Sequence, residues 1–221
     1  MQKENLKEIA KNEGCILFGI ADITEIKSSF NIEPKVVLTG LNRAVSLGYV
    51  LSAPILATNI ESPSKLYAQH YKKINILLDV ASLKIASCLH QSGFIAMPIP
   101  ASQLLDWKNF SAHLSHRKIA YLAGLGWLGK NNLLVNPDFG AHVRYISILT
   151  DAPLIPDAPL GNKCPPGCLK CITSCPANAI GESPEQFNLS RCLEKLTIFS
   201  REPGIGQHIC GICVNACNGS T

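Results

Sequence analysis

The stretch from Cys164 to Pro176 reads CPPGCLKCITSCP, with its four cysteines spaced as C-x3-C-x2-C-x3-C. Cysteines separated by two residues can turn their thiolates toward one metal cluster. The fourth, Cys175, is followed directly by Pro176, and in bacterial iron–sulfur runs of this form the fourth cysteine ligates the other cluster of a pair. The stretch therefore predicts half of a two-cluster site.

A second group of cysteines completes the pattern, because eight of the ten cysteines lie between Cys164 and Cys217. Crossing the last cysteine of each run predicts two ligand sets. The first set is Cys164, Cys168, Cys171 and Cys217. The second set is Cys175, Cys192, Cys210 and Cys213. Each set suits one [4Fe–4S] cluster, and no ligand is left over.

Two other uses of these cysteines stay open. Structural zinc is also held by four cysteines, and the long gap from Cys192 to Cys210 departs from a compact two-cluster repeat. Disulfides are typical of oxidising compartments. The segment Met1–Gly14 is charged and lacks the apolar core of a secretion signal. No stretch of about 20 apolar residues is present, so we expect a cytoplasmic protein with no membrane contact.

Composition narrows the class of partner. The 221-residue chain carries a net charge of +4, with 16% charged residues and no long Lys/Arg run. A large nucleic-acid surface is therefore not indicated.

A proline-rich stretch divides the chain. Residues 151–160 read DAPLIPDAPL, and three prolines in ten residues exclude a helix interior. We interpret the stretch as a stiff connector between an α+β domain, residues 1–155, and a small cysteine-rich domain, residues 156–221. A domain as small as the second one needs its metal to fold stably.

Apolar periodicity predicts helices and strands that alternate along the first domain. Ser62-Pro63 is expected to open a long helix that ends at Gly93. Cys15 and Cys88 lie on expected core faces, as small hydrophobes. Besides a first helix ending near Gly14, the other expected elements are strands at 15–21, 44–51 and 94–97, a helix at 112–122, and strands at 133–135 and 143–149 joined by a turn at 136–140.

Residues 123–130 read AGLGWLGK and hold three glycines in six residues. Glycine permits close backbone approach and positive φ. The spacing Gly124-x-Gly126-x-x-Gly129 also fits a dinucleotide fingerprint, but that fingerprint follows a strand and opens a helix. Here the expected helix comes first, so the dinucleotide interpretation is weak.

Several segments together resemble the epoxyqueuosine reductases, which share their plan with the reductive dehalogenases. The segments are GLGWLGK at 124–130, NLLVNPDFG at 132–140, LTDAPL at 149–154, CLEKLTI at 192–198 and the double cysteine pattern. The resemblance implies a nitroreductase-like mixed sheet with helices that binds cobalamin, followed by a small ferredoxin-like module with two [4Fe–4S] clusters. It also implies that the glycine segment lies at the corrin, through Gly124, Gly126, Trp127, Gly129 and Lys130.

The sequence departs from that family in three places. Phe110 stands where the family carries a catalytic Asp, and the first cysteine gap is one residue longer. The sequence ends at Thr221, whereas longer members continue into a helical-repeat domain that helps to hold tRNA. We therefore expect tRNA not to be the substrate. His113 and His116, three residues apart on the expected helix, are the candidates to replace the acid, because histidine titrates near neutral pH.

These observations predict an iron–sulfur oxidoreductase. Electrons from a donor such as ferredoxin or flavodoxin are expected to pass through two [4Fe–4S] clusters to a cobalamin, in a reductase whose substrate the sequence does not identify. The acceptor is then a corrinoid or a small molecule. The alternative is a non-catalytic electron carrier or reductive activator that serves a partner protein.

Overall fold

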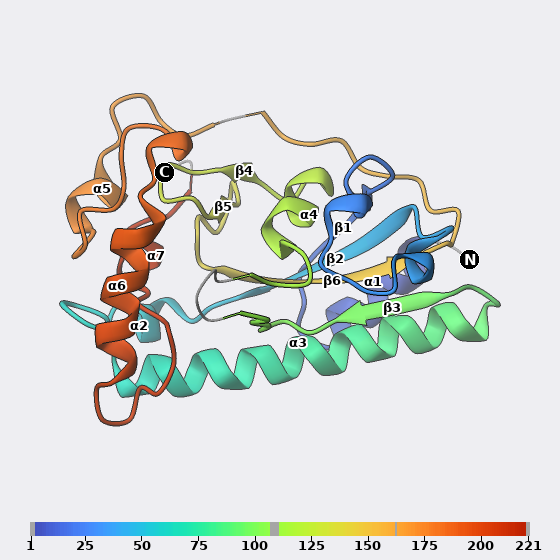
Figure 1. The fold of residues 1–221 in the computed structure, drawn as a ribbon, viewed down its shortest axis with the longest axis horizontal. Helices are drawn as coiled ribbons and strands as arrows, with labels where there is room; N and C mark the ends of the chain where they lie inside the picture. Colours follow the sequence, from blue (N-terminus) through green and yellow to red (C-terminus); the bar gives the residue numbers. More distant parts are fainter. Residues whose placement is uncertain (1–2, 107–110, 162, 220–221) are drawn as a thin grey trace. The chain divides into compact units, whose positions relative to one another are not determined.

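The computed structural model describes residues 3–106, 111–161 and 163–219. Figure 1 shows its helices and strands. They are α1 (Lys3–Asn12), β1 (Leu17–Asp22), β2 (Arg43–Val50), α2 (Ala53–Leu56), α3 (Lys65–Gln91), β3 (Ala96–Ile99), α4 (His116–Leu122), β4 (Trp127–Leu128), β5 (Leu134–Val135), β6 (Val143–Thr150), α5 (Lys170–Ser174), α6 (Leu189–Ser200) and α7 (Ile212–Asn215). Helices and strands mix along the chain, as the α+β prediction requires.

The chain folds as two compact units, and neither is continuous in sequence. Unit 1 comprises residues 1–49, 75–125 and 144–160. Unit 2 comprises residues 50–74, 126–143 and 161–221. The last division, after Leu160, lies near the expected boundary at residue 155. The cysteine-rich segment is joined within unit 2 by two earlier stretches of chain.

Unit 1 is built on a four-stranded sheet in the order β1-β2-β6-β3. The two outer pairs are antiparallel, with Leu17 opposite Gly48 and Ala96 opposite Thr150. Strand β6 is almost entirely buried, so apolar residues occupy both of its faces. In Figure 1 the long helix α3 runs along the sheet, and its unit 1 part buries Leu78.

Helix α4 packs against β1 through a glycine. A Cβ atom on Gly19 would collide with the carbonyl oxygen of Ala123, at the end of α4. The missing side chain therefore sets how closely the helix approaches the strand.

The connector at 151–160 covers the free edge of β1. Asp157 accepts the backbone N–H of Ile20 at 2.8 Å and returns its own N–H to the Ile20 carbonyl, also at 2.8 Å. The Asp157 carboxylate also pairs with Lys3 at 2.5 Å. The expected stiff connector is thus an extended segment held against an edge strand, which protects that edge from other pairing.

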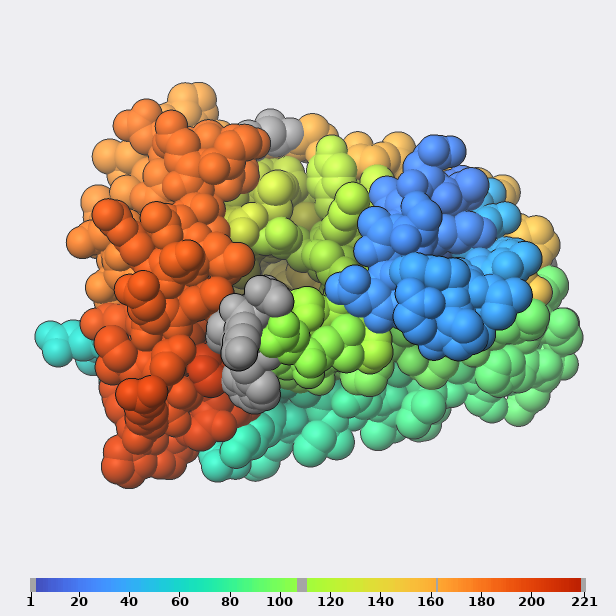
Figure 2. Space-filling model, in the orientation of Figure 1, coloured from blue at the N-terminus to red at the C-terminus, as the bar shows by residue number. Residues whose placement is uncertain are grey.

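Unit 2 contains the two-stranded hairpin β4–β5 and the short helices of the cysteine-rich segment. Trp127 lies opposite Val135, and Leu128 opposite Leu134. Helix α7 packs against α5 and α2. On the face that Figure 2 shows, the residues between 175 and 219, orange to red, form one continuous surface.

Three sequence predictions need correction. Helix α3 begins at Lys65 and not at Ser62-Pro63, because the Ser64 hydroxyl accepts the Tyr67 N–H at 2.9 Å and caps the helix there. Residues 112–115 are not helical, since the Ser115 hydroxyl caps α4.

The third correction concerns the strand at 133–135. It pairs with β4, which periodicity did not reveal, and β6 joins the larger sheet. The turn at 136–140 is present as expected, with the Asn136 side chain accepting the N–H groups of Asp138 and Phe139.

Candidate metal centres

The first cysteine run is held by a tight turn and a short helix. Cys168 donates its backbone N–H to Pro165, and Gly167 adopts a positive φ of 72° inside that turn. Helix α5 then buries Cys171, and Cys175 follows the end of the helix. Because the chain turns at Cys168, the thiols of Cys164 and Cys171, before and after the turn, line the same pocket as Cys168.

Four thiols line one pocket of unit 2, and we refer to them as the first thiol group: Cys164, Cys168, Cys171 and Cys217. Burial raises the pKa of Cys171 to about 11, and nearby Cys217, Cys164 and Cys168 raise it further. Burial, and then Cys168, also raise the pKa of Cys164. Thiols this close resist ionisation together, unless a cation binds them and displaces their protons.

The other four cysteines form the second thiol group: Cys175, Cys192, Cys210 and Cys213. Burial raises the pKa of Cys213, with added repulsion from Cys210, Cys175 and Cys192. Burial also raises the pKa of Cys210 to about 11. The sulfur of Cys175 accepts the backbone N–H of Ala179 at 3.4 Å.

Two local features position the second thiol group. Helix α6 carries Cys192 and is capped by the Asn188 side chain, which accepts the Arg191 N–H at 3.0 Å. Gly211 turns the chain between Cys210 and α7 with a φ of 80°. A Cβ atom there would lie 2.5 Å from the Asn59 amide nitrogen, so this position needs glycine.

Crossed ligation predicts that Cys217 belongs with the first run and Cys175 with the second. Cys217 lies with the first run, and Cys175 interacts with cysteines of the second. Among the described residues, no three His, Cys, Asp or Glu side chains gather tightly enough to hold a single metal ion. The thiols of the first group surround a pocket and do not converge on one point. Their assignment as ligands stays a prediction.

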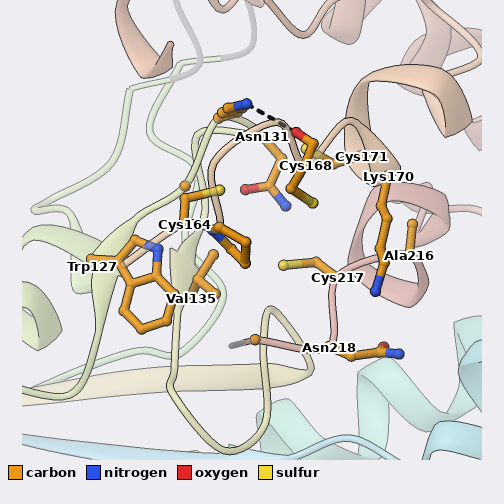
Figure 3. Close-up of a pocket in the computed structure, with 14 residues that line it drawn as sticks. Trp127, Asn131, Val135, Cys164, Cys168, Lys170, Cys171, Ala216, Cys217 and Asn218 are labelled. Carbon is orange, nitrogen blue, oxygen red and sulfur yellow. Dashed lines mark hydrogen bonds between the residues drawn. The ribbon is translucent and has the colours of Figure 1, made fainter. Parts of the chain in front are cut away.

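The β4–β5 hairpin lines the pocket of the first thiol group, called the first pocket below, on the side that the cysteines leave free (Figure 3). Lys130 donates from Nζ to the Cys168 carbonyl at 2.9 Å, and this hydrogen bond ties the hairpin to the cysteine turn. Its charge also opposes the upward pKa shift of Cys164. Lys170, from α5, brings a second cation to the same pocket.

The glycine segment, expected at a corrin, packs against protein at two of its positions. A Cβ on Gly124 would lie 2.6 Å from the Ala158 carbonyl oxygen, within unit 1. A Cβ on Gly126 would collide with the Val135 carbonyl. The backbone approach that these glycines permit is therefore used by the chain itself. Trp127, Gly129 and Lys130 line the first thiol pocket.

Two side chains of this pocket wall were not anticipated in their present role. Trp127 is 1% exposed and Asn131 is 3% exposed. The Trp127 indole N–H and the Asn131 amide NH₂ are buried and have no hydrogen-bond partner among the described residues. A buried polar group without a partner costs about 1–3 kcal/mol, so such groups need an explanation.

The two candidate histidines do not share a helix face. His113 precedes α4 and borders a separate hollow with Asn31 and Lys118. His116 lies at the start of α4, where Nε2 is 2.9 Å from the Pro100 carbonyl and Nδ1 is 3.0 Å from the Ser147 hydroxyl.

Burial lowers the pKa of His116 to about 4. His116 is therefore neutral near pH 7, with Nε2–H donating to the carbonyl, and it serves the packing of unit 1. Phe110, which stands in the place of the family acid, lies outside the described residues.

Comparison with known proteins identifies relatives over most of the chain. No protein-family profile matches. The epoxyqueuosine reductase of Shewanella oneidensis is 31% identical over 181 residues, covering 79% of this chain and 44% of that protein. The chain is a homologue of the epoxyqueuosine reductases. It spans less than half the length of that relative.

Solved structures agree on the fold. A crystal structure of epoxyqueuosine reductase with a tRNA-Tyr epoxyqueuosine-modified stem loop has a TM-score of 0.61 and 21% identity, over 88% of this chain and 56% of that one. A reductive dehalogenase structure, described as suggesting a mechanism for B12-dependent dehalogenation, has a TM-score of 0.60 and 20% identity. It covers 81% of this chain and 25% of the other. No helix in the described part of the chain is long and apolar enough to cross a membrane.

Proposed function

We propose that this chain is an iron–sulfur oxidoreductase that binds two [4Fe–4S] clusters in unit 2. The observation that carries the proposal is the division of eight buried or half-buried thiols into two groups of four. Thiolates are the ligands of such clusters. The upward pKa shifts fit sites that are completed by a cation, because metal coordination removes the thiol protons.

Anaerobic reconstitution tests this proposal directly. The protein should bind about eight irons and eight sulfides per chain and absorb broadly in the visible region. Zinc bound in place of iron, with no visible absorption, would contradict it. Replacing Cys15, a buried thiol of unit 1, by Ala should leave the iron content unchanged.

We further propose that unit 1 is a nitroreductase-like domain and that unit 2 contains a ferredoxin-like module. The clusters supply single-electron chemistry at low potential when bound. In this scheme an external donor, such as ferredoxin or flavodoxin, reduces the protein. The kinship with epoxyqueuosine reductases and the fold shared with a B12-dependent dehalogenase support a cobalamin acceptor.

The corrin contact expected of the glycine segment stays a proposal. Backbone of the chain itself lies where a Cβ on Gly124 or Gly126 would project. Titration of cob(II)alamin into the reconstituted protein tests for the cofactor. A shift of its cobalt EPR spectrum to a base-off form supports a cobalamin-dependent reductase, and an unchanged spectrum at large protein excess removes it.

tRNA is not the substrate in this proposal. Phe110 replaces the acid that opening an epoxide requires, and among the described residues His116 is held neutral. An assay with epoxyqueuosine-containing tRNA and a strong reductant should form no queuosine. Robust turnover would contradict this expectation and direct attention to His113.

The alternative function is electron transfer to a partner protein, without chemistry in unit 1. Two observations favour it: Phe110 in the place of the acid, and a glycine segment that packs against the chain itself. Intact clusters with no cobalamin binding would support a carrier or reductive activator.

A further inference from the structure

Two side-chain N–H groups at the first thiol group lack hydrogen-bond partners among the described residues. The Trp127 indole nitrogen can only donate a hydrogen bond. It is buried at the pocket and has no acceptor among the described residues. A buried indole N–H without an acceptor is costly, so the unpaired N–H indicates an acceptor inside the pocket.

The orientation of Asn131 is fixed by its other atom. Its Oδ1 accepts the Leu133 backbone N–H at 3.2 Å. The oxygen and nitrogen of an amide are distinguished by such a network, and this one turns Nδ2 away from Leu133. Figure 3 shows the Asn131 amide directed into the space between the Cys164 and Cys168 side chains.

The glycines of the hairpin make room for both donors. A Cβ on Gly129 would lie 2.7 Å from Asn131 Oδ1 and 2.6 Å from a Val135 methyl group. Gly126, next to Trp127, lets the strand approach the Val135 carbonyl. The same glycine spacing that suggests a nucleotide loop therefore places two N–H donors at the thiols.

We propose that Trp127 Nε1 and Asn131 Nδ2 donate hydrogen bonds to sulfur atoms of the cluster held by the first thiol group, either sulfide or cysteine sulfur. This inference rests on the proposed function. Reduction adds negative charge to the cluster, and hydrogen bonds to charged acceptors are stronger than those to neutral ones. The two donors therefore stabilise the reduced state and raise the reduction potential, which such bonds are known to set.

The test uses the reconstituted full-length protein with ¹⁵N-indole tryptophan. In the reduced protein, pulsed EPR should detect hyperfine coupling between the first cluster and an indole ¹⁵N nucleus. The cluster is identified by the signal that Cys164→Ser alters. The coupling should be absent in Trp127→Phe. Because the chain contains two tryptophans, the coupling is assigned to Trp127 by its loss in a Trp127→Phe protein that still binds both clusters.

Redox titration gives the second readout. Trp127→Phe and Asn131→Leu should each shift the first cluster to more negative potential. A tenfold change in the oxidised-to-reduced ratio at fixed potential corresponds to about 59 mV for a one-electron couple, and we expect at least that shift for Trp127→Phe.

Matched controls exist for both substitutions. Tyr145→Phe removes a buried, unpartnered aromatic polar atom in unit 1. Ser46→Ala removes a buried, unpartnered hydroxyl in unit 1. Neither control should change the first cluster's potential.

The outcomes separate the two proposals. A wild-type protein that binds no iron overturns the proposed function, and the inference falls with it. Two intact clusters with no ¹⁵N coupling overturn the inference alone and leave a water molecule as the partner of the indole. If coupling and potential disagree, the coupling decides.

Discussion

Ala141 donates its backbone N–H to the carbonyl oxygen of Cys217 at 3.0 Å. This hydrogen bond joins the turn at 136–140 to the last cysteine, over 70 residues later in the chain. Gly140 lies at the same contact, with a φ of 59° and no space for a Cβ beside the Cys217 carbonyl. The backbone of the turn therefore positions one thiol of the first group.

Gly140→Ala should displace Cys217 and reduce the iron content from about eight to about four per chain. Gly206→Ala is the matched control, since Gly206 has a φ of 60° and nothing within 4 Å of its Cβ position. Both substitutions carry the cost of positive φ, about 1–2 kcal/mol, but the control meets no backbone. Equal iron loss in the two variants would refute the role of the contact.

Cys217→Ser should disturb the cluster of Cys164, Cys168 and Cys171, and Cys192→Ser should disturb the other. The reason is that Cys217 lines the first pocket whereas Cys192 lies near Cys175. EPR of the reduced variants should show loss of different signals. If both substitutions remove the same signal, the crossed assignment is wrong.

The stability of unit 1 should fall in acid through His116. Its folded pKa, about 4, lies below its ordinary value because of burial, so the unfolded chain binds the proton first. The stabilisation is complete above about pH 6.5 and is lost as the pH falls toward 4. We expect a loss of about 1–3 kcal/mol, because the buried ring must take up a proton as the pH falls.

Denaturant titrations from pH 7 to 4 check this, with His116→Gln as the comparison. The charge of Arg144, which also disfavours protonation of His116, is retained in both proteins. The wild type should lose more stability than the variant over this range. Parallel curves would contradict the assignment.

Asp157→Ala should destabilise the protein by about 1–3 kcal/mol, because it leaves the N–H of Ile20 without its acceptor. Lys3→Ala removes only the ion pair, whose side chains are 33% and 35% exposed, and should cost less than about 1 kcal/mol. Chemical denaturation measures both. Similar losses would mean that the ion pair, and not the strand edge, matters.

The sequence predicts those parts of the fold and the site whose residues are close together along the chain. The spacing within each cysteine run led to the predicted ligand sets, whose role as ligands stays a prediction; in the structure Cys217 lines one pocket with Cys164, Cys168 and Cys171. The strands of the large sheet were also predicted, because they are short apolar runs and turn-forming residues such as Gly14 and Pro98 bound them. Strand β4 has two residues, which is too few for any period.

The wall of the first pocket depended on contacts that no local pattern encodes. Lys130 reaches Cys168 across 38 residues, and Trp127 becomes part of a thiol pocket only when the cysteine segment packs on the hairpin. The sequence also predicted the wrong first residue for α3 and α4, which begin at Lys65 and His116, and the reason is simpler. A nearby serine, Ser64 or Ser115, provides the cap in the structure, and the sequence offers several candidates.

Unit 2 takes its parts from three separate stretches of the chain. A gene fragment that begins after Leu160 would encode all eight cysteines but neither the hairpin nor Asn59. The cysteine-rich segment is therefore not expected to fold as an independent domain when it is fused to another protein. Exchange between relatives by recombination would have to carry the intervening segments along, so the two units are expected to have been inherited together.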